Sequence, residues 1–97
     1  MARIEIAPGV LDDVDRIFDH LSEHEVENVS PRISEIIQAF AVLEGNPLIG
    51  RPVPGDKREL IIGRRTHGYA ALYRYVMEID TVFVLALRSQ REVGYRL

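Results

Sequence analysis

The hydrophobic and polar positions along the chain first predict a short strand and then a helix. Residues 3–7 alternate between apolar and polar, as expected of a strand, and Pro8 ends the alternation. Apolar residues then recur at helical spacing to about residue 24, which predicts an amphipathic helix. They are Val10, Val14, Ile17, Phe18 and Leu21. Asp12 and Asp13 are expected in the first turn of this helix, where the helix dipole favours negative charge.

A second helix is predicted from about Ser30 to Glu44. Ser30 is a suitable N-cap and Pro31 a suitable first helical residue, and Gly45 suits the position after the end of the helix. A stripe of large apolar side chains is expected to form its buried face. The stripe consists of Ile33, Ile36, Ile37 and Phe40.

The second half of the chain predicts a loop followed by three strands. The segment Asn46–Asp56 contains three prolines and two glycines, which restrict or redirect the backbone as in a loop. Three apolar segments joined by short loops then predict antiparallel strands at 58–62, 69–76 and 81–88. The last is apolar on both faces, so we expect it in a central position of the sheet. Together these elements predict a single α+β domain over residues 1–97, with both helices on one face of a mainly antiparallel sheet.

Composition excludes several classes of protein. With 97 residues the chain has the size of one small domain, and 46% hydrophobic residues exclude a disordered chain. It has no run of about 18 apolar residues and no apolar core of a signal peptide near Met1, so neither a membrane span nor export is expected. Cysteine is absent, which excludes disulfides and thiolate metal sites. We therefore expect a cytoplasmic protein.

The net charge of −3 conceals two halves of opposite sign. Residues 1–44 carry three basic and ten acidic side chains, a balance of −7, whereas residues 45–97 carry nine basic and five acidic ones, a balance of +4. Eight of the nine bases are arginine, which favours recognition through the fork of the guanidinium group. A basic surface suits an acidic partner, either a nucleic acid or an acidic protein segment, although the same charges also occur on a merely solvated face.

The order of motifs after residue 45 resembles the RelE/ParE toxins of bacterial type II toxin–antitoxin modules, which are also called plasmid stabilisation proteins. The similarity rests on Asn46–Pro52 (NPLIGRP) before the three strands and on the ending Leu85–Arg88 (LALR) with Arg91 and Tyr95. It implies a β-α-α-β-β-β fold. It also implies a second helix that starts nearer Glu25 and is bent by the proline inside it.

The RelE branch of this family cleaves messenger RNA on the ribosome, and the resemblance implies an active surface on the sheet. Such a site needs a base for the 2′-hydroxyl, cations for the charge that develops on the phosphoryl group, and an acid for the leaving oxygen. The candidate catalytic residues that match the family's positions are Arg51, Arg58, Arg88, Arg91 and Tyr95.

Two departures favour the other branch. Nuclease members carry an arginine at the position of Ala70 and often a histidine at the position of Ser89. Loss of a cation that stabilises the transition state typically lowers the rate by orders of magnitude. The ParE branch poisons DNA gyrase by binding and lacks this nuclease set, so the resemblance favours a ParE-like gyrase inhibitor. The alternatives are a RelE-like ribosome-dependent endoribonuclease and an inactive relative that acts only in antitoxin-coupled autoregulation, so both an enzyme and a binding protein stay open.

For a ParE-like toxin, the resemblance implies DNA gyrase and a ParD-like antitoxin as partners, with a toxin–antitoxin hetero-oligomer and DNA bound only through the antitoxin. No cofactor, metal or membrane is expected. The expected functional surface comprises Arg64, Arg65, Arg74, Arg88, Arg91, Tyr95 and Arg96. Within it, Arg91 and Tyr95 would share a face if the end of the chain forms a helical turn. The alternative is a structural latch in which Val93 and Leu97 dock on the core.

Other candidate sites have simple structural explanations. His20 and His24 are spaced as a metal pair on a helix, but they lie among acidic residues on its polar side. His67 lies in a predicted hairpin loop. Three tyrosines share one face of a strand, where they either stack bases or form a half-buried aromatic row against a helix or a partner. They are Tyr69, Tyr73 and Tyr75.

Overall fold

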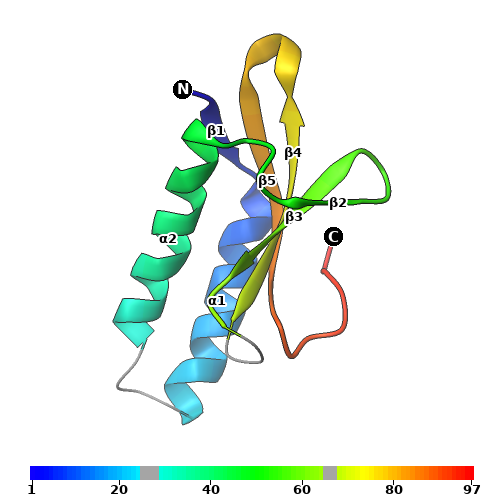
Figure 1. The fold of residues 1–97 in the computed structure, drawn as a ribbon. Helices are drawn as coiled ribbons and strands as arrows, with labels where there is room; N and C mark the ends of the chain where they lie inside the picture. Colours follow the sequence, from blue (N-terminus) through cyan, green and yellow to red (C-terminus); the bar gives the residue numbers. More distant parts are fainter. Residues whose placement is uncertain (25–28, 65–67) are drawn as a thin grey trace.

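Two helices cover one face of a five-stranded sheet (Figure 1). The computed structural model describes residues 1–24, 29–64 and 68–97. The elements, in chain order, are β1 (Arg3–Ile6), α1 (Pro8–His24), α2 (Val29–Gly45), β2 (Arg51–Val53), β3 (Lys57–Ile62), β4 (Tyr69–Val76), the 3-10 helix η3 (Met77–Ile79) and β5 (Thr81–Ser89). The strand order is β1-β5-β4-β3-β2, and β1 is parallel to β5 while the other pairs are antiparallel. The predicted α+β fold and the interior position of the last strand are confirmed.

The starts of both helices differ from the prediction. Pro8 is the first residue of α1, where a proline loses no intrahelical hydrogen bond, rather than the residue that separates strand from helix. The first turn of α1 therefore holds no acidic residue, and Asp12 and Asp13 lie further along the helix. In α2, Ser30 lies inside the helix, because the described part of α2 begins at Val29. The alternative start near Glu25 lies outside the described residues.

The loop predicted at Asn46–Asp56 contains a short strand. β2 pairs with β3 in the register Arg51↔Glu59 and forms one edge of the sheet. Its central residue is Pro52, which disguises the strand in the sequence but is compatible with an edge position. The turn into β3 uses positive φ angles at Gly55 and Asp56.

The tyrosines of β4 belong to the core on the helix side of the sheet. Tyr69 and Tyr73 are buried, and Tyr75 packs against the same cluster, so the alternative in which this row stacks bases is wrong. The Tyr73 hydroxyl accepts a hydrogen bond from the Gly50 amide at 2.9 Å. Arg58 donates to the carbonyl oxygens of Leu48 and Gly50 at 3.1 and 2.8 Å, so the loop before β2 is held from two sides.

The predicted buried stripe of α2 is correct except at one position. Ile36 and Phe40 are buried and Ile33 is half-buried, but Ile37 is 61% exposed. The sheet lies along only one side of α2, and Ile37 points past it. A large apolar side chain is thus left on the outer surface of the helix.

A β-bulge divides β5 into two parts. Tyr73 of β4 faces Val84, but Leu72 faces Ala86, so Leu85 is an extra residue without a partner on β4. Val82 and Val84 face the helices before the bulge, and Leu87 does so after it.

Side chains of α1 cap the edge of β5 beyond the end of β1. The last backbone hydrogen bond to this edge of β5 comes from Ala7, directly after β1, whose amide donates to the Val84 carbonyl at 2.9 Å. Further along β5, the buried Asp13 carboxylate accepts from the Leu87 amide at 2.9 Å and from Arg16 at 2.8 Å. Arg16 in turn reaches the Leu87 carbonyl at 3.4 Å. Asp13 and Arg16 thus supply the acceptor and the donor that a neighbouring strand would supply.

Replacement of Asp13 by Ala is expected to lower the free energy of unfolding by about 1–3 kcal/mol, because the buried Leu87 amide loses its acceptor. Asp12→Ala is the matched control, since Asp12 is exposed and its removal should change the free energy by less than about 0.5 kcal/mol. Urea unfolding of both variants measures the difference. Equal stability of the two variants would contradict the assigned role of Asp13.

Gly50 is expected to tolerate no side chain. A Cβ at this position would lie 2.7 Å from the Tyr73 ring and hydroxyl and 2.9 Å from the Glu59 carbonyl oxygen. Gly50→Ala should therefore cost about 1–3 kcal/mol of stability. Gly9→Ala, where a Cβ meets no atom within 4 Å, should be neutral or slightly stabilising in the same urea titration.

Candidate functional site

The face of the sheet opposite the helices carries the arginines and the tyrosine that the sequence singled out. Residues that face one another across strands share a face, and one such row is Arg51, Glu59, Leu72 and Ala86. The next row is Ile61, Ala70 and Arg88. Residues 90–97, which we call the tail, turn back after β5 on the side of the sheet away from the helices (Figure 1).

The buried carboxylate of Glu59 is the centre of this face. Its side chain is only 5% exposed, yet it contacts groups from β2, β5 and the tail. Arg51 donates to Oε1 through Nε at 2.8 Å and also through Nη2. The Tyr95 hydroxyl donates to Oε2 at 2.5 Å, and Arg88 Nη2 lies 3.5 Å from the same oxygen. The Arg88 guanidinium also lies 5.1 Å from the centre of the Tyr95 ring, within the range of a cation–π contact.

Ala70 leaves the space that this cluster needs. Arg88 lies on β5 and Glu59 on β3, so the Arg88 side chain must cross β4 to reach the carboxylate. The residue opposite Arg88 on β4 is Ala70, which has only a methyl group and is fully buried. An arginine at position 70, as in nuclease relatives, would share the face with Arg88 and compete for Glu59. The alanine at position 70, which departs from the arginine of the nuclease members, is thus the residue that lets Arg88 reach Glu59.

The electrostatics of the cluster hold Glu59 ionised and Tyr95 protonated. Burial by itself would raise the pKa of Glu59, but the hydrogen bonds from Tyr95 and Arg51 and the charges of Arg51 and Arg88 outweigh it, so its pKa is lowered. Burial raises the pKa of Tyr95, and the hydrogen bond to Glu59 and the charge of that carboxylate raise it further. A tyrosine in this state donates hydrogen bonds at neutral pH and does not serve as a general base.

The structure therefore brings together three of the five candidate catalytic residues. Arg51, Arg88 and Tyr95 meet at Glu59. Arg58 belongs to the opposite face, because it faces Tyr73 across the sheet and binds the loop before β2. Arg91 is exposed, and its side chain makes no hydrogen bond or ion pair within the described part of the chain.

The remaining members of the expected functional surface are spread over the molecule. Arg74 donates to the Gly55 carbonyl at 3.2 Å and steadies the turn between β2 and β3. Arg64 is exposed after the end of β3, and Arg96 lies 3.9 Å from Glu92 within the tail. Arg65 lies outside the described residues. The sequence thus predicted one basic surface. Of its described members, Arg88, Arg91, Tyr95 and Arg96 belong to the end of β5 and the tail, whereas Arg64 and Arg74 lie elsewhere.

The tail has a different conformation from both forms that the sequence suggested. It consists of a turn and bends followed by residues without regular secondary structure, and not of a helical turn, so Arg91 and Tyr95 do not share a helical face. Val93 and Leu97 are 104% and 85% exposed, so a latch made by docking them on the core is also wrong. The contacts that hold the tail are polar. Glu92 accepts from Arg16 at 3.1 Å and from the Ser89 amide at 3.0 Å, and Tyr95 binds Glu59.

The described side chains form no cluster that could hold a metal ion. Among residues 1–24, 29–64 and 68–97, no group of three or more His, Asp or Glu side chains is placed to hold a metal ion. The side chains of His20 and His24, and the whole of His67, lie outside what the structure describes.

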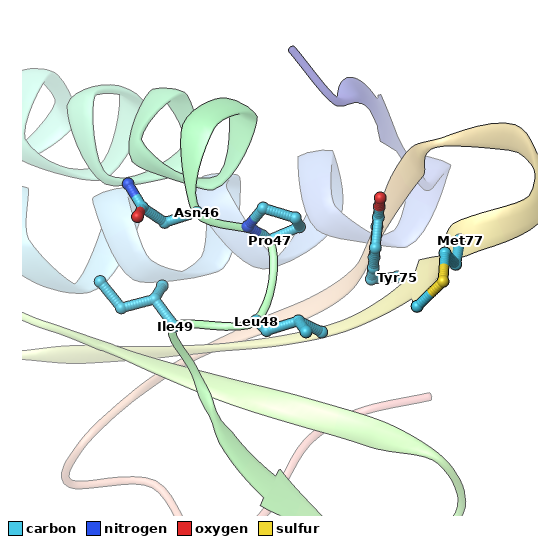
Figure 2. Close-up of a pocket in the computed structure, with 6 residues that line it drawn as sticks. All are labelled: Asn46, Pro47, Leu48, Ile49, Tyr75 and Met77. Atoms are coloured by element: carbon cyan, nitrogen blue, oxygen red, sulfur yellow. The ribbon is translucent and has the colours of Figure 1, made fainter.

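A shallow apolar cleft of about 500 Å³ lies on the other side of the molecule, between the loop after α2 and the end of β4 (Figure 2). Leu48, Ile49, Tyr75 and Met77 line it together with Asn46 and Pro47. The Tyr75 hydroxyl at its rim donates to Asp80 at 2.6 Å. The described side chains that line the cleft include no candidate catalytic base or nucleophile. The cleft therefore suits an apolar contact and not a reaction.

Glu59 was not singled out by the sequence patterns, although it is the centre of the site. The available signal was an acidic residue in a predicted strand, directly before the apolar residues Leu60 and Ile61. In a half-buried strand such a residue needs partners, and the second half of the chain is rich in arginine. Which arginines pair with it depends on strand register, which the sequence pattern does not specify.

Comparison with known proteins identifies the family of the chain. The family model for the ParE toxin of the type II toxin–antitoxin system parDE matches residues 4–94. No curated protein matches the sequence at a significant level. Neither α1 nor α2, over the residues that the structure describes, combines the length and hydrophobicity that a helix needs to cross a bilayer.

Similar folds occur in solved toxin–antitoxin complexes. The chromosomal ParDE system from P. aeruginosa matches with a TM-score of 0.76 and 20% identity, over 92% of this chain and 96% of that chain. The intact E. coli RelBE complex matches with a TM-score of 0.61 and 16% identity, over 95% and 100% of the two chains. The RelBE2 complex from Mycobacterium tuberculosis gives 0.60 and 22%, over 91% and 96%. With a fold of the RelE/ParE type and a family model that spans nearly its whole length, the protein belongs to the ParE toxins of type II toxin–antitoxin systems.

Proposed function

We propose that the protein is a ParE-like toxin that inhibits DNA gyrase by binding it in the cytoplasm, without cleaving RNA. The observation that carries this proposal is that the arginines of the Glu59 cluster are already paired with a carboxylate of the protein itself. Arg51 and Arg88 are the candidate cations for a phosphoryl transition state, and both already bind the Glu59 carboxylate. A phosphate that entered this face would compete with an internal anion that is almost fully buried.

The state of Tyr95 supports the same conclusion. Its hydroxyl donates to Glu59, and burial and the Glu59 carboxylate raise its pKa, so Tyr95 itself does not act as a base at neutral pH. A ribonuclease that uses the 2′-hydroxyl as nucleophile needs such a base. The cluster therefore suits a structural role in a recognition surface better than a catalytic one.

The tail supplies the exposed groups that a binding surface needs. Arg91 and Arg96 are exposed, as is Val93 between them. Arginine is enriched among the residues that contribute strongly to protein interfaces. Because Arg91 makes no ion pair with the described residues, it is available to a carboxylate or phosphate of the target.

We further propose that a cognate antitoxin covers the helix side of the protein. The similar solved structures are toxin–antitoxin complexes. On this chain, Ile37 and Val42 of α2 and Leu11 of α1 are 61%, 44% and 64% exposed, so the two helices present apolar side chains that are available to a partner. An amphipathic antitoxin helix would bury them, and an acidic antitoxin segment would suit the basic second half of the toxin.

Purified protein is expected to inhibit gyrase supercoiling and to leave messenger RNA intact in a translation reaction. Arg91→Ala should weaken the inhibition at least about tenfold, equivalent to roughly 1.4 kcal/mol, with an unchanged melting temperature because Arg91 is exposed. Arg3→Ala is the matched control, since Arg3 is an exposed arginine at the far edge of the sheet.

The same pair of assays separates the competing functions. Cleavage of messenger RNA on ribosomes with normal supercoiling would contradict the proposal and favour a RelE-like nuclease. Silence in both assays, with harmless expression of the protein, would favour a relative that acts only with its antitoxin. If Arg91→Ala inhibits gyrase as strongly as the unmodified protein, the tail is not part of the proposed binding surface.

The product of the adjacent reading frame is expected to bind the toxin through α2. Ile37→Glu should weaken that complex by roughly tenfold or more, because it places a charge in an apolar contact. Gln38→Glu adds the same charge to the neighbouring exposed position and should have a smaller effect. Isothermal titration with each variant measures both affinities. Equal affinities for the two variants would show that the antitoxin binds elsewhere.

A further inference from the structure

We propose that Glu59 is a positioning residue for target recognition: through Tyr95 it holds the tail in the conformation that presents Arg91 and Val93 to the target. This inference rests on the proposed role of the tail in binding. It concerns a residue on β3 that is itself buried, so Glu59 acts through the tail and not by touching the target.

The two ends of the tail are held in different ways. Near β5, Glu92 binds Arg16 and the Ser89 amide, and its carbonyl accepts from Arg88 at 3.2 Å. Beyond Glu92, Tyr95 returns the chain to the sheet through the hydrogen bond of its hydroxyl to Glu59 and through the contact of its ring with the Arg88 guanidinium, while Arg96 lies 3.9 Å from Glu92 within the tail. Val93 is fully exposed and contributes no packing. The position of the outer tail against the sheet therefore depends on the Tyr95 side chain and the two groups that receive it, Glu59 and Arg88.

The backbone at Gly94 directs Tyr95 back toward the sheet. Gly94 has a φ of +76°, a conformation that residues with a Cβ adopt at a cost, and a Cβ there would meet no atom within 4 Å. Substitution by alanine would thus oppose the turn without a steric clash. Gly94 offers a way to disturb the tail that leaves Glu59 and Tyr95 chemically intact.

The carboxylate that receives Tyr95 is held in one orientation. Arg51 occupies Oε1 from the β2 side, so Oε2 is directed to Tyr95 and Arg88. The Tyr95 ring in turn lies against the Arg88 guanidinium. A binding segment that is ordered before the encounter loses less conformational entropy on binding, so this arrangement should strengthen recognition without adding a contact to the target.

The competing explanation is that Glu59 only ties β2 to β3 through Arg51. In that case the Tyr95 hydroxyl would be incidental, and its removal would change neither the tail nor binding. Tyr95→Phe separates the two explanations because it removes one oxygen and leaves the Glu59–Arg51 contact in place. Tyr75→Phe is the matched control, since it also removes a tyrosine hydroxyl bonded to a carboxylate, that of Asp80, at the other side of the molecule.

The test measures two quantities for each variant: the rate of trypsin cleavage after Arg91, located by mass spectrometry, and the inhibition of gyrase supercoiling. Tyr95→Phe, Glu59→Gln and Gly94→Ala are each expected to raise the cleavage rate after Arg91 and to weaken inhibition, both by roughly tenfold. Tyr75→Phe should match the unmodified protein in both. The double variant of Glu59→Gln and Tyr95→Phe should be no worse than the more affected single variant, because both changes break the same contact.

Three results would overturn the proposal. They are an unchanged cleavage rate after Arg91 in Tyr95→Phe, a raised cleavage rate with unchanged inhibition, and fully additive effects in the double variant. If Glu59→Gln fails to fold, Tyr95→Phe and Gly94→Ala still decide the question. If the unmodified protein does not inhibit gyrase, the proposed function fails, whereas the cleavage rates alone still report whether Glu59 holds the tail.

Discussion

The hydrogen bond from the Leu87 amide to the Asp13 carboxylate fixes the end of β5, and both faces of the sheet depend on that end. β1 covers the edge of β5 only as far as Val84. Beyond it, Asp13 and Arg16 of α1 bind the backbone of Leu87 in place of a strand. This contact ties the helix layer to the sheet. It also fixes the backbone next to Arg88, whose side chain contacts Glu59 on the opposite face of the sheet.

Two buried acids thus organise the domain, one on each side of the sheet. Asp13 pairs with Arg16 on the helix side, and Glu59 pairs with Arg51 and Arg88 on the tail side. Buried ion pairs add little net stability once desolvation is counted, but they constrain orientation because an unpaired buried charge is costly. Part of the positive charge of the second half is consequently used inside the protein. A partner meets mainly the arginines outside these pairs, such as Arg91.

The sequence was sufficient for the elements whose evidence is local. Alternation and helical spacing located β1, β3, β4, β5 and both helices, and the apolar character of β5 placed it in the interior. β2 was missed because a proline at its centre is a loop signal unless the strand is known to be at an edge. Ile37 was assigned to the buried stripe because spacing defines a helical face but not how far the sheet extends beneath it.

The site was only partly predictable for a related reason. Arg51, Arg88 and Tyr95 were found through family resemblance, whereas Glu59, which joins them, was not. Their meeting depends on pairing across three strands, in which Glu59 faces Leu72 and Arg88 faces Ala70. Arg58 was assigned to the same site by the same resemblance, as an alternative to Arg51, but it lies on the opposite face because neighbouring residues of a strand point to opposite faces.

The bulge at Leu85 determines which side chains in the second part of β5 face the helices. In an unbroken strand, Arg88 would share a face with Val82 and Val84, and it would enter the core. The extra residue shifts the alternation by one position, so that Leu87 enters the core instead and Arg88 reaches Glu59. Deletion of Leu85 would remove the bulge but leave both side chains on their present faces, because Ala86 would still pair with Leu72, Leu87 with Ala71 and Arg88 with Ala70. A sequence alignment with a relative that lacks the bulge must therefore place its gap at Leu85, because a gap elsewhere in β5 would assign the wrong residue to the face opposite the helices.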